Sequence, residues 1–139
     1  MIEFLQQNWP LVLGLVVIAA VMLKGPVLQK WFGIGSVDPA GAVRLVNREN
    51  AQVVDVREDR EWREGHIPGA IHLPLSQLDK DLDRLAPYRE QEKPLVLVCR
   101  SGSRSVTAAV RLRRAGFDSV YNLSGGATAW KQAGMPLES

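Results

Sequence analysis

The sequence predicts an α/β domain with a mainly parallel sheet flanked by helices, preceded by one transmembrane helix. Segments of strand and helix character alternate after residue 35, as in α/β domains. Within them, Leu95–Val98 is a continuous apolar run, which is typical of a parallel strand buried on both faces. The 139 residues therefore divide into an N-terminal anchor helix and linker, residues 1–35, and one globular domain, residues 36–139.

The N-terminal segment has the length and composition of a membrane span. No charged residue occurs from Phe4 to Leu23, and twenty helical residues rise about 30 Å, the hydrocarbon thickness of a bilayer. Trp9 lies near one end and Trp31 and Phe32 follow the other, where interfacial aromatic residues are expected. We expect residues 4–23 to attach the protein to a membrane.

Two other interpretations of this segment stay open. A cleaved signal peptide usually begins with basic residues, whereas this chain begins with Glu3 and has no lysine or arginine there. A buried or interfacial helix would need a polar face, which residues 4–23 lack. Lys24 and Lys30 follow the span, so the positive-inside rule predicts a single-pass protein of the bacterial inner membrane with its domain in the cytosol.

The elements of the domain follow from local signals. Asp38 and Pro39 are suited to the N-cap and first turn of a helix that continues to about Arg48. Strands are predicted at residues 52–56, 70–73, 95–98 and 120–123, from short apolar runs. Helices are predicted at residues 58–63, at 75–85 from leucines at helical spacing, at 103–115 with Gly116 as C-cap, and after Gly125–Gly126 around Trp130.

Composition excludes several classes of function. The net charge is +2 without a polybasic run, so no nucleic-acid partner is expected. The chain has one cysteine and no C-x-x-C pair, so we expect neither an internal disulfide nor a metal site. We also expect no cofactor. A free thiol kept as a working group suits a reducing compartment.

That cysteine, Cys99, lies in the sequence C-R-S-G-S-R-S, directly after the strand at 95–98. Ligands of open α/β sheets bind at the carboxyl ends of strands, and the following helix directs its free N–H groups toward this loop. Small residues allow several N–H groups to converge on one anion, and the two arginines add positive charge. This setting favours a thiolate, the nucleophilic form of cysteine. A buried structural cysteine is the alternative interpretation.

The sequence resembles the rhodanese-like domains. Their active-site loop, roughly C-R-x-G-x-R-S, matches residues 99–105. Other segments of the family occur in the same order, namely Asp55-Val56-Arg57, Glu64-Gly65-His66-Ile67-Pro68-Gly69-Ala70, and Gly125-Gly126 with Trp130. The resemblance extends over about residues 37–136, nearly the whole predicted domain, and excludes the N-terminal span.

The resemblance implies a sulfurtransferase that forms a persulfide on a catalytic cysteine, Cys99. A donor such as thiosulfate supplies the sulfur, and a thiol or cyanide-like acceptor removes it, with ping-pong kinetics. The loop residues would bind the anionic groups, namely Arg100, Ser101, Gly102, Ser103 and Arg104. Asp55 and Arg57 would support the site. No general base is required, so His66 and His72 are interpreted as structural residues. Glu61, Trp62 and Arg63 are candidates for walls of the pocket, and a solvated helix face is the preferred interpretation of them.

Two other functions remain possible. Cysteine phosphatases of the cell-cycle type and some arsenate reductases share the fold, but their loop is longer by one residue than the four residues between Cys99 and Arg104. A membrane-tethered binding or regulatory module, with little or no turnover, is the second alternative. It would act on a membrane-protein partner.

Overall fold

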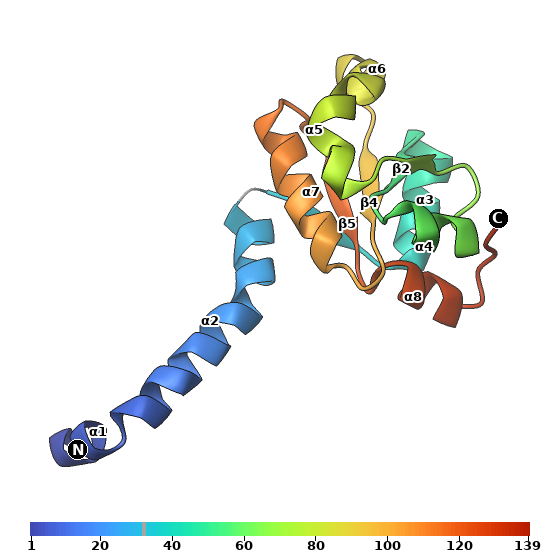
Figure 1. Cartoon of the computed structure of the whole chain (residues 1–139). Coiled ribbons are helices and arrows are strands. Elements are labelled where there is room, and N and C mark those ends of the chain that lie inside the picture. Colours follow the sequence, from blue (N-terminus) through green and yellow to red (C-terminus); the bar gives the residue numbers. More distant parts are fainter. Residues whose placement is uncertain (32) are drawn as a thin grey trace.

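The computed structural model describes residues 1–31 and 33–139, and for residues 23–31 it describes the backbone alone. The predicted interfacial Phe32, and the side chains of Lys24, Lys30 and Trp31, lie outside the described part of the chain. Figure 1 shows a compact α/β domain from which the N-terminal helices project.

The N-terminal segment forms two helices in place of the single helix predicted over residues 4–23: α1 (Ile2–Gln7) and α2 (Trp9–Trp31). Asn8 separates them, and its side-chain amide donates a hydrogen bond to the Phe4 carbonyl at 3.0 Å. Such side-chain bonds compete with helix continuation. Over the part of the chain that the structure describes, no helix has the combination of length and apolar character needed to cross a membrane, and the predicted transmembrane helix receives no support from it.

A parallel sheet of five strands forms the centre of the domain, which confirms the predicted α/β fold with a parallel sheet flanked by helices. Its order is β1 (Gly35–Val37), β5 (Val120–Leu123), β4 (Leu95–Val98), β2 (Gln52–Asp55) and β3 (Ile71–His72). Every neighbouring pair is parallel. The carboxyl ends of β2, β4 and β5 therefore meet at one edge of the sheet, and this edge carries the site.

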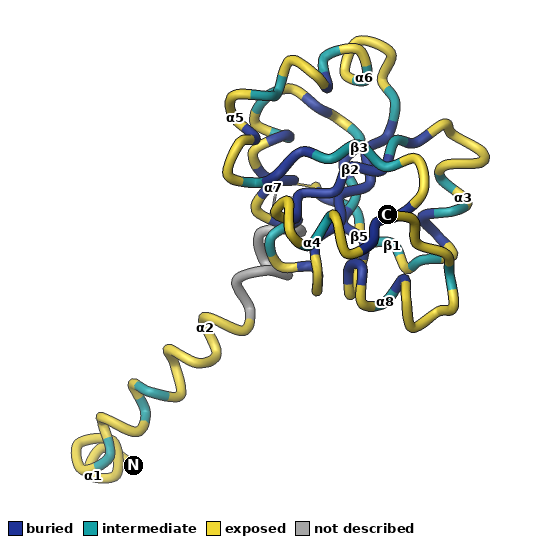
Figure 2. The backbone as a smooth tube through the Cα atoms, turned by 45° about the vertical axis from the view of Figure 1, so that its right-hand side comes forward, coloured by how far each residue is buried: buried dark blue, intermediate teal, exposed yellow. Residues whose placement is uncertain are grey.

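Helices cover both faces of the sheet, because alternate residues of each strand point to opposite faces. Val54, Leu95 and Leu97 pack under the helices α5 (Leu78–Asp81) and α7 (Ser103–Arg114). Val53 and Val96 pack on the other face, with α3 (Pro39–Glu49) and α8 (Gly126–Gln132). Figure 2 shows the resulting buried centre, and the exposed chain of α2 outside it.

Two segments differ in detail from the sequence prediction. Ile34 and Gly35, at the end of the predicted anchor and linker, already contact the domain, because Ile34 is buried in the core and Gly35 pairs with Tyr121. The helix predicted at 75–85 is divided into a 3-10 turn (Leu75–Gln77), α5 and a second 3-10 turn (Leu82–Leu85), followed by α6 (Ala86–Glu90). Leucines three apart fit a 3-10 turn as well as an α-helix, so their spacing did not distinguish the two.

Candidate active site

Cys99 follows β4 directly and lies at the bottom of its loop. Its side chain is fully buried, and the backbone N–H of Gly102 donates to Sγ at 2.9 Å. The loop can turn back on the sulfur because Gly102 has φ +103°, a conformation that glycine adopts without strain. The hydroxyl of Ser105, in the first turn of α7, lies 3.4 Å from the same sulfur. Both contacts can stabilise a negative charge on sulfur.

The start of α8 holds this loop in place from the other side. Ala127 N–H donates to the Cys99 carbonyl at 2.8 Å, and Thr128 N–H to the Arg100 carbonyl at 3.1 Å. Gly126, with φ +58°, has no side chain between them, and a Cβ there would overlap the Cys99 carbonyl and lie 2.7 Å from the Arg100 carbonyl carbon. Gly126 therefore allows a close approach of two backbones.

We expect Gly126→Ala to destabilise the fold by more than about 3 kcal/mol, because the methyl group meets rigid backbone in addition to the unfavourable φ. Gly134→Ala is the matched control, since Gly134 has a similar φ of +75° but open space around its Cβ position. Gly134→Ala should lower the free energy of unfolding by about 1 kcal/mol, because it adds only the backbone strain. Urea denaturation of the two variants measures the difference, and equal losses would contradict the steric explanation.

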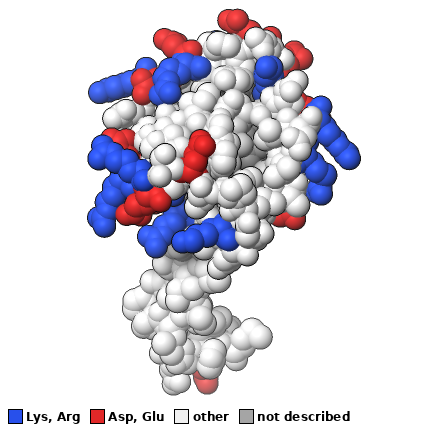
Figure 3. Space-filling model, turned by 90° about the vertical axis from the view of Figure 1, so that its right-hand side faces the viewer, with Lys and Arg blue, Asp and Glu red and all other residues white. Residues whose placement is uncertain are grey.

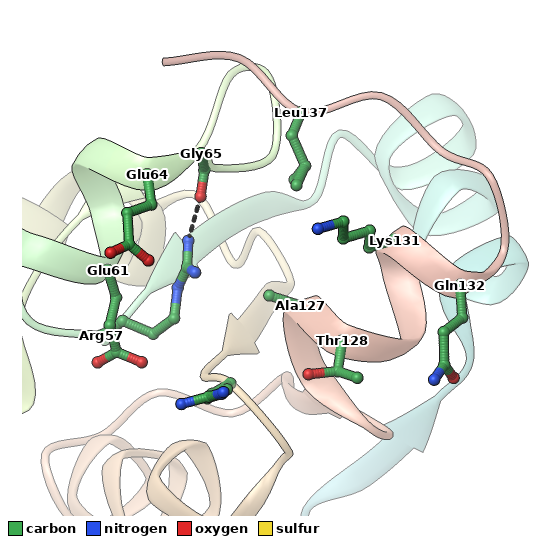
Figure 4. Close-up of a pocket in the computed structure, with 10 residues that line it drawn as sticks. Arg57, Glu61, Glu64, Gly65, Ala127, Thr128, Lys131, Gln132 and Leu137 are labelled. Atoms are coloured by element: carbon green, nitrogen blue, oxygen red, sulfur yellow. Dashed lines mark hydrogen bonds between the residues drawn. The ribbon is translucent and has the colours of Figure 1, made fainter.

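Asp55 and Arg57 form a buried ion pair at the carboxyl end of β2. Arg57 Nε donates to both carboxylate oxygens at 3.0 Å and Nη2 donates to Oδ2 at 2.8 Å. The side chains are 1% and 9% exposed, respectively. Arg57 also donates to the Gly65 carbonyl at 2.7 Å, a bond that Figure 4 shows. The pair thus joins β2 to the chain after α4 (Asp59–Glu64).

Arg104, predicted to bind an anion beside Cys99, makes a bidentate pair with Glu61 of α4. The two N···O distances are 2.6 and 2.7 Å. The hydrogen bond from Arg104 lowers the pKa of the Glu61 carboxyl, and the same bond raises the pKa of Arg104. Glu61 was expected on a solvated helix face, and this expectation is wrong because its side chain is only 24% exposed and is bound to the loop.

This ion pair makes the free energy of unfolding depend on pH in the acidic range. The folded-state pKa of Glu61 lies below its ordinary value of 4.5, so the stabilisation is fully present above that pH and is lost as the pH falls through the lowered pKa. Glu61→Gln should therefore lower the melting temperature at pH 7 more than at pH 3. Thermal unfolding of both proteins at the two pH values measures this, and an equal decrease at both would contradict it.

A cavity of about 420 Å³ opens beside the loop. Three cationic side chains line it, Arg57, Arg100 and Lys131, together with the carboxylates of Glu61 and Glu64. Figure 4 shows Lys131 and Arg57 on opposite sides of the opening, on α8 and after β2. The cavity can therefore accept a small anion. The part of the chain that the structure describes contains no cluster of ligating side chains suited to a metal ion.

A family model described as rhodanese-like domain matches residues 38–133. The chain belongs to the rhodanese family. The thiosulfate sulfurtransferase GlpE of Actinobacillus pleuropneumoniae serotype 3 is 31% identical over 103 residues, 74% of this chain and 92% of that protein. A sulfurtransferase of Allochromatium vinosum is 38% identical over 98 residues, 68% of this chain and 84% of that protein.

The solved structures agree on the fold. A protein of unknown function from Rhodopseudomonas palustris, described as a possible tyrosine phosphatase, has a TM-score of 0.68 and 29% identity, over 82% of this chain and 93% of that one. The relatives named above support a rhodanese-type sulfurtransferase.

The rhodanese-like domain gathers most of the predicted site residues at one edge. Cys99, Gly102, Asp55 and Arg57 are buried there. The side chains of Arg100, Ser101 and Ser103 are exposed, and Arg104 is turned to Glu61. Their functions in binding and catalysis stay predictions.

Trp62 lies between the two histidines of the rhodanese-like domain. Its ring is stacked on His66 at 3.5 Å and on His72 at 4.5 Å between centroids. A ring nitrogen of His66 bonds the Trp62 carbonyl, and one of His72 bonds the Arg57 carbonyl. Both histidines therefore have structural roles, since each packs on Trp62 and bonds a backbone carbonyl. Of the three residues expected on a solvated helix face, only Arg63 is exposed.

Three contributors to the site of this rhodanese-like domain were not among the residues predicted to bind or to support it. The last residues form one wall of the cavity, because Glu138 and His66 exchange backbone hydrogen bonds at 2.8 Å and Leu137 then lines the opening. Ser105 and Asn122 lie behind the sulfur, and Asn122 is buried in β5. A polar residue in an otherwise apolar strand was the available signal for Asn122.

Proposed function

We propose that the protein is a sulfurtransferase that moves sulfane sulfur from a donor such as thiosulfate to a thiophilic acceptor through a persulfide on Cys99. The observation that carries this proposal is the Gly102 N–H bonded to the buried Cys99 Sγ at 2.9 Å. A backbone N–H that donates a hydrogen bond to the sulfur stabilises the anionic forms of Cys99, the thiolate and the persulfide. Arg57, Arg100 and Lys131 around the cavity support the approach of an anionic donor.

The reaction has two balanced steps. The Cys99 thiolate attacks the outer sulfur of thiosulfate, a new S–S bond forms, and sulfite leaves with the electron pair of the bond that breaks. Cyanide or a thiolate then attacks the outer sulfur of the persulfide, and the Cys99 thiolate leaves and is regenerated. No external oxidant, reductant or cofactor enters either step.

The intact mass of the full-length protein after incubation with thiosulfate tests the proposal. A gain of one sulfur atom that cyanide removes is the expected result. No gain, with the thiol reduced and the protein folded, would overturn the sulfurtransferase proposal in favour of a binding or regulatory module. The complete burial of Cys99 is the observation that favours this second candidate, since a donor must displace part of the loop to reach the sulfur.

A phosphatase activity is less well supported. The loop holds four residues between Cys99 and Arg104, and both terminal nitrogens of Arg104 are bonded to Glu61. A phosphatase needs room and a free guanidinium for three phosphate oxygens. We expect no hydrolysis of p-nitrophenyl phosphate under conditions in which thiosulfate transfers sulfur.

We further propose that residues 4–23 attach the protein to the bacterial inner membrane as a single-pass anchor, with the catalytic domain in the cytosol. The proposal is supported by the uncharged sequence and by exposed apolar side chains around α2, among them Leu11, Leu15, Ile18 and Met22. Figure 3 shows that charged side chains are spread over the domain, whereas the N-terminal segment is almost uncharged. This attachment would place the domain within reach of a membrane-protein partner.

Replacing Leu15 by Lys in the full chain tests the attachment, because a lysine in the middle of the span costs about 2.5–3.5 kcal/mol. The native protein should sediment with membranes and resist extraction by carbonate, whereas the variant should be released. Glu3→Lys, outside the span, is the control. A native protein that stays in the supernatant would overturn this proposal without affecting the proposed chemistry.

A further inference from the structure

Ser105 and Asn122 form a buried chain of polar groups that ends at the Cys99 sulfur. The Ser105 hydroxyl lies 3.4 Å from Sγ, and it donates to the carboxamide oxygen of Asn122 and to the Gly102 carbonyl, the latter at 3.1 Å. Ser105 and Cys99 are fully buried and Asn122 is 5% exposed, so water does not replace these bonds. The reaction described above uses neither Ser105 nor Asn122.

The hydroxyl of Ser105 has one proton for three acceptors. When Cys99 is a thiol, its S–H can donate to Ser105, and the Ser105 proton then serves Asn122 or Gly102. When Cys99 is a thiolate, the sulfur has no proton and accepts hydrogen bonds only, and it can take a second one beside that from the Gly102 N–H. The Ser105 proton is then drawn to the sulfur, and the carboxamide oxygen of Asn122 loses its donor.

An asparagine can resolve this conflict and most other side chains cannot. A half-turn of the carboxamide exchanges its oxygen for its NH₂ group, which have nearly the same shape. The NH₂ group then donates to Ser105, and Ser105 donates to the sulfur anion. The direction of the hydrogen bonds reverses while the outline of the side chain stays the same, because only the oxygen and the nitrogen of the carboxamide exchange positions.

We propose that Asn122 is a positioning residue that acts through Ser105: by turning its carboxamide, it directs the Ser105 hydroxyl to the Cys99 sulfur when that sulfur is negatively charged. The Cys99 thiolate forms without any sulfur-donating substrate, so the proposed effect of Asn122 on the thiolate does not depend on the proposed sulfurtransferase activity. Stabilisation of the persulfide by the same chain rests on the proposed function.

Ultraviolet absorbance of the thiolate, followed as a function of pH, tests the proposal in the full chain without a sulfur donor. The signal belongs to Cys99 because the chain has a single cysteine, and Cys99→Ser gives the blank. Ser105→Ala and Asn122→Leu, which has a similar size but no polar atoms, should each move the midpoint of thiolate formation upward by roughly one pH unit. Thr107→Ala, on the exposed side of α7, is the control and should leave the midpoint unchanged.

The double variant separates a relay from two independent effects. If Asn122 acts through Ser105, the double variant should have the midpoint of Ser105→Ala alone. A midpoint shifted by the sum of the two single effects, or an unchanged midpoint in folded Asn122→Leu, would overturn the proposal. If Asn122→Leu does not fold, Asn122→Asp keeps the shape but only accepts at neutral pH, so a midpoint that stays in place in that variant would overturn it equally.

Discussion

We expect Cys99→Ser to abolish sulfur transfer while the fold stays intact. The hydroxyl that replaces the thiol can still accept the Gly102 N–H and bond Ser105, so the buried site keeps its contacts. An alcohol does not ionise at neutral pH and forms no persulfide, so turnover with thiosulfate and cyanide should fall at least about a thousandfold. A thiocyanate assay measures the turnover, and thermal unfolding shows that the variant is folded.

This variant separates the proposed mechanism from any other route. The chain has no second cysteine that could take over the nucleophilic step. Turnover equal to that of the native protein would therefore place the transferred sulfur away from Cys99 and overturn the persulfide mechanism. Loss of turnover together with loss of the thermal transition would call for Cys99→Ala as the second variant, judged by the same two measurements.

Asp55→Ala should cause a large loss of stability. It leaves the Arg57 guanidinium, 9% exposed, without its carboxylate, and breaking one partner of a buried pair costs about 3–5 kcal/mol. It also removes the acceptor of the Arg57 backbone N–H. A domain of this size is stable by about 5–15 kcal/mol, so the variant should unfold at much lower urea concentration.

Two comparisons make this prediction specific. Arg60→Ala removes an exposed partner of Glu64, at 3.7 Å and with 91% and 70% exposure, and should change stability by less than about 0.5 kcal/mol. The double variant Asp55→Leu with Arg57→Met removes both buried charges and should be more stable than Asp55→Ala. A double variant that is less stable than the single one would show that the contacts of Arg57 to Gly65 matter more than the buried charge.

The parts of the site that follow from local sequence could be predicted. Cys99 lies at the end of a buried apolar strand, and Asp55 ends the neighbouring one, so parallel pairing alone brings them to one edge. Asp38 caps its helix as expected, because its side chain accepts from the Gly41 N–H at 2.7 Å. These features depend on neighbours a few positions away or on the direction of strands.

The parts that depend on distant partners could not be predicted. Arg104 finds Glu61 across 43 positions, and nothing in either segment distinguishes this pair from other pairs of opposite charge. The strand β1 has only three residues, Gly-Ser-Val, without apolar alternation, and it exists because β5 offers it a free edge. The break at Asn8 depends on one side-chain bond within an otherwise helical, apolar segment.

The position of β1 has a consequence for the order of events during synthesis. The strand nearest the N-terminus, at residues 35–37, pairs only with β5, at residues 121–123. Closing so long a loop is slow, and a nascent chain that ends before β5 lacks the strand with which β1 pairs. The sheet is therefore completed only after nearly the entire chain has left the ribosome, whereas the apolar N-terminal helices emerge first and must be accommodated before the domain that follows them has folded.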